Sequence, residues 1–289
     1  MSKRWRVLFS CLVTRAVHIE LVEEMSADAF INALKRFISV RGPVKIIRSD
    51  RGTNFIGAAS ELQLDVINVE DQPTKQFLLN SGTQWIFNTP HSSHMGGAWE
   101  RMIRTCRRIL DSIFMEHSQI RLTHDILNTF MAEVSAIVNS RPLVPVSTDS
   151  ECPLILTPAM LLTQKTEYKF LTGACEGGSS RNMYKSSWKR VQALSTVFWS
   201  RWRKEYLPLL QERRKWSETR RDLQVGDVVL LKDKNLTKYE WPIGRIENVF
   251  KGNDGHVRKA EIKVMINGKA TRYIRPIVNM VLLVETNRL

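Results

Sequence analysis

The chain has 289 residues, of which 43% are apolar and 25% are charged. This composition is typical of folded globular domains and excludes an intrinsically disordered chain. No apolar run approaches the roughly 20 residues that a membrane-spanning helix needs, so we expect no membrane association. The four cysteines are scattered without Cys-x-x-Cys spacing, which argues against a zinc ribbon or a disulfide framework. We therefore expect a reducing location, nuclear or cytoplasmic, and no secretion.

The 43 Lys and Arg residues exceed the 29 Asp and Glu residues, which gives a net charge of +14. The excess is uneven, because residues 181–289 hold 24 basic and 11 acidic side chains whereas residues 1–180 are almost neutral. Solubility alone would not require one charge sign to be concentrated in one segment. A basic segment that is also rich in tryptophan favours a polyanionic partner, and nucleic acid is the first candidate.

The first half of the chain alternates between strand and helix patterns. Residues 6–13 and 16–22 are rich in β-branched and aromatic side chains and predict a hairpin that turns at residues 14–15. Ser26 is a favoured helix start and Gly42 a favoured stop, with apolar residues at helical spacing between them. The pattern then predicts, in order, strands at 44–48 and 84–87, an amphipathic helix from Trp99 to Phe114, and a second one from Thr123 to a point before Arg141.

The second half begins with a connector, residues 141–187, which is rich in Pro, Ser, Thr and Gly. A helix is predicted next, with one apolar side formed by Val191, Leu194, Phe198 and Trp202. From Leu223 onwards the pattern changes to a small barrel of short strands, at 227–232, 241–250 and 259–266, with a hairpin turn at Asn267-Gly268. We expect the tryptophans of this region to pack in a core rather than to stack on bases, namely Trp188, Trp199, Trp202 and Trp216.

Two carboxylates stand where α/β folds often place their chemistry. Asp50 ends a predicted strand inside a polar, glycine-containing loop, and Glu100 lies in the first turn of a predicted helix. If they converge, they can hold a divalent metal, and the arginines of the same helix, Arg104, Arg107 and Arg108, would face phosphates. On spacing alone a structural role is favoured, because Asp is common in turns and the helix dipole favours Glu in a first turn.

Seven segments in collinear order carry a resemblance to a known family. They are FSCLVTRAVHIE at 9–20, SDRGTNF at 49–55, HMGGAWER at 94–101, WKRVQ at 188–192, FWSRWRKEYLP at 198–208, VGDVVL at 225–230 and WPIGR at 241–245. Over nearly the whole chain they resemble the integrase of BEL/Pao retrotransposons. The resemblance implies an α/β RNase H-like integrase core, followed by a helical connector and a small all-β SH3-like barrel.

The resemblance also implies a function, the metal-dependent polynucleotidyl transfer that joins element DNA to host DNA. Asp50 and Glu100 match the second and third acids of the family's catalytic triad and are expected to bind Mg²⁺ or Mn²⁺. The implied partners are DNA, as element ends and as target, and further copies of the chain. The DNA contacts that we expect are Asn54, Arg104, Arg107, Arg108, Lys189, Arg190, Arg201 and Arg203.

The expected domains are an integrase core at 1–145, a connector with a basic helical segment at 146–222, and the barrel, a candidate DNA-binding domain, at 223–289. The chain departs from the family at its start. The family's first catalytic Asp lies on a strand before the hairpin, and here only residues 1–4 precede the hairpin. We therefore expect a core that lacks its first strand. The alternative is a non-catalytic DNA-binding remnant of a retroelement polyprotein.

Overall fold

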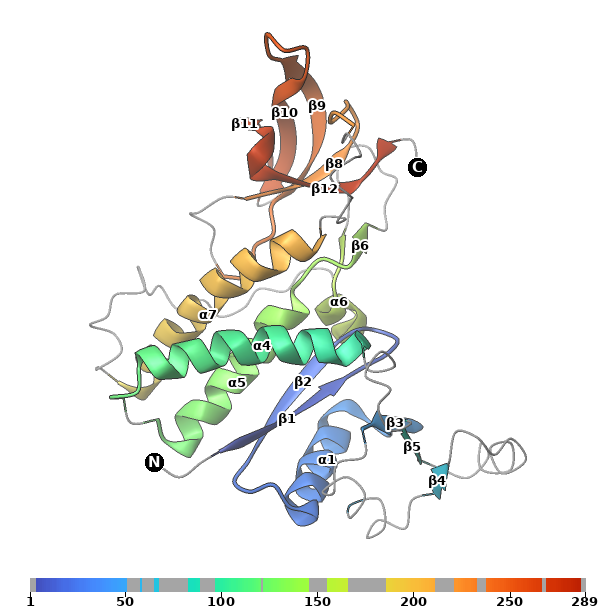
Figure 1. The fold of residues 1–289 in the computed structure, drawn as a ribbon, viewed down its shortest axis with the longest axis vertical. Helices are drawn as coiled ribbons and strands as arrows, with labels where there is room; N and C mark the ends of the chain where they lie inside the picture. The colour runs from blue at the N-terminus through green and yellow to red at the C-terminus, as the bar shows by residue number, and fades with distance from the viewer. Residues whose placement is uncertain are drawn as a thin grey trace. The chain divides into compact units, whose positions relative to one another are not determined.

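The structure of the chain is a computed structural model that describes residues 4–50, 58, 65–67, 83–88, 97–120, 122–145, 155–165, 186–210, 221–232, 238–266 and 269–286 (Figure 1). It contains helices and strands in both halves and is of the mixed α/β class. The chain divides into two compact units, one of residues 1–135 and 186–191, the other of residues 136–185 and 192–289. No helix in the described ranges is long and apolar enough to cross a membrane.

The first unit opens with a hairpin of two antiparallel strands, β1 (Trp5–Ser10) and β2 (Val17–Val22). This confirms the predicted hairpin, although β1 is shorter than predicted. The chain turns early because the Cys11 N–H donates to the Ala16 carbonyl at 2.8 Å, and Arg15 takes a left-handed conformation with φ 57°. The apolar residues between these strands are therefore in a turn and not in the ladder.

The first helix, α1 (Ala27–Arg41), begins and ends at the residues that the sequence indicates. Ser26 is the N-cap, and its hydroxyl accepts a hydrogen bond of 3.2 Å from a first-turn N–H. Gly42 ends the helix with φ 90°, a conformation that other residues rarely adopt. Phe30 and Leu34 are buried on the inner side of the helix.

Three parallel strands form a second sheet in this unit, in the order β3 (Ile46–Ser49), β5 (Gln84–Phe87) and β4 (Asp65–Ile67). β3 and β5 confirm the predicted strands at 44–48 and 84–87. Within the described residues the hairpin and these strands are separate sheets. One hydrophobic core joins them through α1, and its members include Val7, Phe9, Phe30, Leu34, Ile47, Trp85 and Phe87. The continuous RNase H-like sheet stays a prediction.

Two amphipathic helices complete the first unit, α4 (Gly97–Glu116) and α5 (His124–Asn139), the latter continuing into the second unit. Both confirm the predicted helices. Thr123 caps α5, since its hydroxyl accepts the Ile126 N–H at 3.3 Å. The buried residues of α4 are Thr105, Cys106, Ile109, Leu110 and Ile113, and those of α5 include Ile126, Phe130, Val134, Ile137 and Val138.

The hairpin contacts α1 on one face and α4 on the other. This is possible because alternate side chains of β1 point to opposite faces. Phe9 of β1 stacks on Phe37 of α1 with ring centroids 4.4 Å apart. Arg6 of β1 reaches Asp111 of α4 at 3.4 Å, and its guanidinium lies 5.3 Å from the ring centroid of Phe114. The first unit is thus layered as helix, hairpin and helix.

The second unit begins with small elements and a long helix. Strands β6 (Val144–Pro145) and β7 (Ile155–Leu156) pair antiparallel, and α6 (Pro158–Thr163) follows them. Helix α7 (Ser187–Leu210) begins in the first unit and continues into the second. Its predicted apolar side is confirmed, because all four of its members are buried, namely Val191, Leu194, Phe198 and Trp202.

The tryptophans of α7 divide into two groups. Trp199 and Trp202 are buried, which confirms that they pack in a core. Trp188 is 54% exposed, so the prediction that it packs is wrong. It lies in the first turn of α7, where the Lys189 ammonium 5.5 Å from its ring centroid is the cation–π contact that the structure gives it. Trp216 lies outside the described residues.

Five strands of the second unit form an antiparallel sheet in the order β11-β10-β9-β8-β12. Their bounds are β8 (Val228–Leu231), β9 (Ile243–Lys251), β10 (Val257–Ile266), β11 (Lys269–Pro276) and β12 (Met280–Val284), with a 3₁₀ turn at Ile277–Asn279 before β12. They confirm the predicted strands, and the predicted turn at Asn267-Gly268 lies outside the described residues. Closure into an SH3-like barrel stays a prediction.

Both faces of this sheet carry apolar side chains. One face forms a core of Val229, Leu231, Ile246, Ala260, Ile262, Val264 and Met280. On the other face Leu230 and Val281 pack with Leu207 of α7. Helix α7 and the sheet therefore share a hydrophobic core within the second unit.

Gly244 permits a close approach of β9 to β10. A Cβ atom at this position would lie 2.5 Å from Ile262 Cγ2 and 2.5 Å from the Lys263 carbonyl oxygen. Both distances are far below van der Waals contact, so only glycine fits the ladder here.

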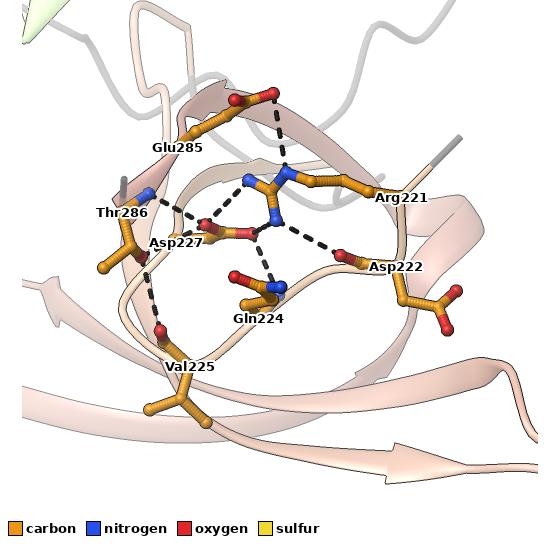
Figure 2. A network of polar contacts seen from close by, with 7 residues as sticks. All are labelled: Arg221, Asp222, Gln224, Val225, Asp227, Glu285 and Thr286. Atoms are coloured by element: carbon orange, nitrogen blue, oxygen red, sulfur yellow. Dashed lines mark hydrogen bonds and ion pairs between the residues drawn. The ribbon is translucent and has the colours of Figure 1, made fainter. Parts of the chain in front are cut away.

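A buried carboxylate connects the segment before β8 with the segment after β12 (Figure 2). Asp227, which is fully buried, accepts two hydrogen bonds of 3.0 Å from the Arg221 guanidinium. The Gln224 N–H donates to it at 2.9 Å and the Thr286 N–H at 3.1 Å. The Thr286 hydroxyl, 3.1 Å from Asp227 and 3.3 Å from the Val225 carbonyl, donates to one of the two.

The charge of Asp227 is retained despite its burial. Burial alone would raise its pKa, but the hydrogen bonds from Arg221, Gln224 and Thr286 more than offset this, so the pKa of Asp227 lies below its ordinary value. The Arg221 guanidinium also lies 3.5 Å from Glu285. Arg221 precedes β8 and Glu285 follows β12, so the network joins the chain that enters β8 to the chain that leaves its neighbour β12.

We expect Asp227→Asn to lower the stability of the second unit by about 3 kcal/mol, because the change removes a buried charge that accepts both Arg221 hydrogen bonds. The folded-state pKa of Asp227 is lowered, so its stabilisation is complete above the unfolded value of about 3.9 and is lost as the pH falls through the folded value. The measurement is the free energy of unfolding by urea between pH 7 and about pH 3, for wild type and variant. Unfolding is followed at the amides of β8 and β12 by pulsed hydrogen exchange, with every pulse at the same pH. Parallel pH profiles for wild type and variant would refute the role of Asp227.

Candidate functional site

Asp50 directly follows β3, and hydrogen bonds fix its backbone. Ser49 donates its hydroxyl to the Asp50 carbonyl at 2.7 Å and accepts the Trp85 indole N–H at 2.9 Å. The Asn88 N–H donates to the Ser49 carbonyl at 2.9 Å. Trp85 is fully buried whereas Asp50 is exposed. The core therefore anchors the strand end and leaves the Asp50 side chain at the surface.

Glu100 lies in the first turn of α4 and is half-buried. The unpaired N–H groups of a helix N-terminus favour a carboxylate there, so the position is also stable without a ligand. β3 and β5 are parallel, so both end at the same edge of their sheet. α4 is the next described element after β5. Asp50 thus follows one strand at this edge, and Glu100 lies in the first turn of the next described helix.

The residues present fit a metal ion only in part. Asp50 and Glu100 offer the hard oxygen ligands that Mg²⁺ and Mn²⁺ prefer. Within the described ranges, however, no three His, Cys, Asp or Glu side chains gather closely enough to hold a metal ion. The metal site that the sequence predicts stays a prediction.

The outer face of α4 is basic. Arg104 and Arg108 are exposed and one helical turn apart, and the exposed Arg101 continues the same face. Arg107 is 77% exposed and lies 3.5 Å from Asp111. Sequence reasoning selected three of these four arginines. It missed Arg101, which the same helical spacing could have found.

The remaining predicted contacts are divided between the two units. Lys189 and Arg190 belong to the part of α7 in the first unit, and Arg201 and Arg203 to its part in the second. All four are half-buried. The Arg203 guanidinium lies 5.6 Å from the ring centroid of Trp199. Asn54 lies outside the described residues.

The sequence analysis missed a further basic site on the sheet. It lies on the outer face, by which we mean the face opposite the core that contains Ile262 and Val264. In the ladder, Lys263 of β10 stands opposite Arg245 of β9 on one side and opposite Arg272 of β11 on the other. We call these three residues the cationic row. Alternation along the strand at 259–266 is a signal that Lys263 faces away from the core, but the pairing register of three strands is needed to bring the other two residues beside it.

Comparisons with known proteins give a family match and a structural similarity. A family described as "Family of unknown function (DUF5641)" matches residues 186–283, which run from α7 to β12. No curated protein matches the chain. Among solved structures, a chain of the "CryoEM structure of simian T-cell lymphotropic virus intasome in complex with PP2A regulatory subunit B56 gamma" is similar, with 12% identity and a TM-score of 0.35. The similarity covers 97% of this chain and 73% of that one, and at this TM-score it does not establish a common fold.

Proposed function

We propose that the chain is a nucleic-acid-binding protein of the retroelement integrase type. The observation that carries the proposal is the arginine face of α4, which begins directly after Glu100 in the chain. The exposed guanidiniums of Arg101, Arg104 and Arg108 follow one another along a single face of this helix. Arginine forks match phosphate oxygens in two-pronged geometry, and such contacts supply most of the affinity of sequence-independent binding.

The excess charge of the last third of the chain supports the same function. The second unit contains the cationic row as well as Arg201 and Arg203. Neither of these groups depends on the carboxylates of the first unit. The chain can therefore bind a polyanion whether or not Asp50 and Glu100 form a catalytic site.

The activity that we propose for the carboxylates is metal-dependent joining of element DNA to host DNA. Asp50 directly follows a parallel strand and Glu100 lies in the first turn of the basic helix, and these two positions support the proposal. When bound, Mg²⁺ or Mn²⁺ would activate the attacking oxygen and stabilise the leaving one. In this proposal Asp50 and Glu100 hold the metal, the arginines of α4 orient the phosphate backbone, and several copies of the chain assemble on the DNA.

The second candidate is DNA binding without catalysis. The position of Glu100 favours it, because the helix dipole alone accounts for an acid in the first turn of α4. Both candidates share the arginine face, and only the first requires the two carboxylates.

The binding proposal is tested with the full chain and a fluorescein-labelled DNA duplex, by anisotropy at several salt concentrations. We expect Arg104→Gln combined with Arg108→Gln to weaken binding about tenfold and to reduce the slope of log K against log salt by about two, because two phosphate contacts are lost. The control is Lys35→Gln with Lys45→Gln, the same loss of charge at two exposed lysines of the first unit. An affinity that is independent of salt, or equal losses in both double variants, would contradict the proposal.

The two candidates are separated by Asp50→Asn and Glu100→Gln in a Mg²⁺-dependent strand-joining assay. If the carboxylates hold the metal, each change abolishes joining and leaves DNA affinity within about twofold, because the shape is retained while an anionic ligand is lost. Asp28→Asn, in the exposed first turn of α1, is the control. Full activity in either variant, or no joining by the wild-type chain, would favour binding without catalysis.

A further inference from the structure

The cationic row places three positive charges opposite one another on adjacent strands. Residues that stand opposite each other in adjacent strands project to the same face, with Cβ atoms about 5 Å apart. Lys263 therefore lies between Arg245 and Arg272. Ile262 and Val264, its neighbours along β10, are buried in the core, so the row belongs to the outer face. Opposed like charges destabilise a ladder, and an anion placed over this row would relieve the repulsion.

One such anion is built into the sheet. Glu247 of β9 carries a carboxylate that accepts hydrogen bonds from Arg272 Nε at 2.7 Å and from Arg272 Nη2 at 3.3 Å. This contact crosses the central strand β10, because Arg272 belongs to β11. The hydrogen bond from Arg272 and the charges of Arg272 and Lys263 hold the pKa of Glu247 below its ordinary value.

A bulge in β9 gives Glu247 its position. Asn248 stands opposite Glu261 and Ile246 stands opposite Ile262, so Glu247 is the extra residue that has no partner across the ladder. A bulge re-aims the side chain that it carries, and bulges occur preferentially at functional places. The side chain of Glu247 is 29% exposed and that of Arg272 is 62% exposed. The pair is therefore open to a competing ligand.

The row also lines a hollow of about 500 Å³. Its walls are formed by Val225, Arg245, Ile246, Glu247, Asn248, Glu261, Lys263 and Arg272. Three neighbouring strands span on the order of 10 Å. A nucleic-acid strand that rises about 3.4 Å per nucleotide presents about three phosphates over that length.

We propose that the cationic row, Arg245, Lys263 and Arg272, binds the phosphate backbone of nucleic acid, and that Glu247 occupies the phosphate position on Arg272 until nucleic acid displaces it. The inference deepens the proposed function and rests on it. Glu247 acts as an internal competitor that lowers the affinity of this face and makes binding depend on displacement of the Glu247–Arg272 pair.

The experiment measures binding of the full chain to the labelled DNA duplex for the wild type and for five charge variants. We expect Glu247→Gln to raise affinity about threefold, the size of an exposed ion pair. Lys263→Gln is expected to lower affinity about threefold and to reduce the salt slope by about one. Glu261→Gln is the matched control, because it removes the same charge from the same hollow, where the Glu261 carboxylate accepts a hydrogen bond from Asn248. It should give less than half the gain of Glu247→Gln.

Displacement is distinguished from a general charge effect by the double variant Glu247→Gln with Arg272→Gln. If a phosphate takes the place of Glu247 on Arg272, the gain from Glu247→Gln is largely lost in the Arg272→Gln background. An equal gain in both backgrounds, or an equal gain from Glu261→Gln, would overturn the inference. If the wild-type chain binds DNA in a salt-dependent manner and the variants at Glu247, Lys263 and Arg272 have the same affinity as the wild type, this inference alone is overturned. Failure of the wild type to bind DNA would overturn the proposed function as well.

Discussion

A carboxylate that has no contact with solvent has to be surrounded by donors, and Asp227 meets this requirement with donors from the segments beside two neighbouring strands, β8 and β12. Arg221 and Gln224 come from the chain that enters β8, and Thr286 comes from the chain that leaves β12. The backbone of the same turn also pairs with β9. The Gly226 N–H donates to the Ile246 carbonyl, and the Ile246 N–H donates to the backbone carbonyl of Asp227. These bonds end directly before Glu247. The bulge that aims Glu247 at Arg272 is thus held from one side by the backbone of the turn that carries Asp227.

The hydrophobic core of the second unit includes more than the sheet. Leu207 of α7 closes over Leu230 and Val281, and Trp241 packs edge-on against Trp199 and Tyr206 with ring centroids 5.0 Å and 5.8 Å away. The family match, residues 186–283, begins with this helix and ends in the last strand. The match therefore includes the part of α7 that shares a hydrophobic core with the sheet.

Local signals in the sequence predicted most of the elements and few of the contacts between them. Ser26 and Gly42 set the ends of α1 because capping depends on neighbouring residues only, and the buried side of α7 followed from its helical spacing. Trp188 was assigned to the core wrongly, because periodicity does not show whether anything covers the first turn. Arg245, Lys263 and Arg272 could not be grouped, since their contact depends on the register of three strands and on a bulge. Asp50 and Glu100 were placed correctly on their elements, but their separation depends on the fold of the intervening chain.

Gly244 carries a consequence for how the sheet can vary. Its missing side chain lets β9 lie against β10 so closely that the Lys263 carbonyl occupies the space of a Cβ atom. A carbonyl in a ladder cannot withdraw without giving up its hydrogen bond, and Ile262 beside it is enclosed by the core. Any larger residue at position 244 would therefore spread the two strands where Arg245 and Lys263 stand side by side. The spacing of Arg245 and Lys263 therefore depends on the absence of a side chain at position 244, and a change at this one uncharged residue would alter the distance between the two charges.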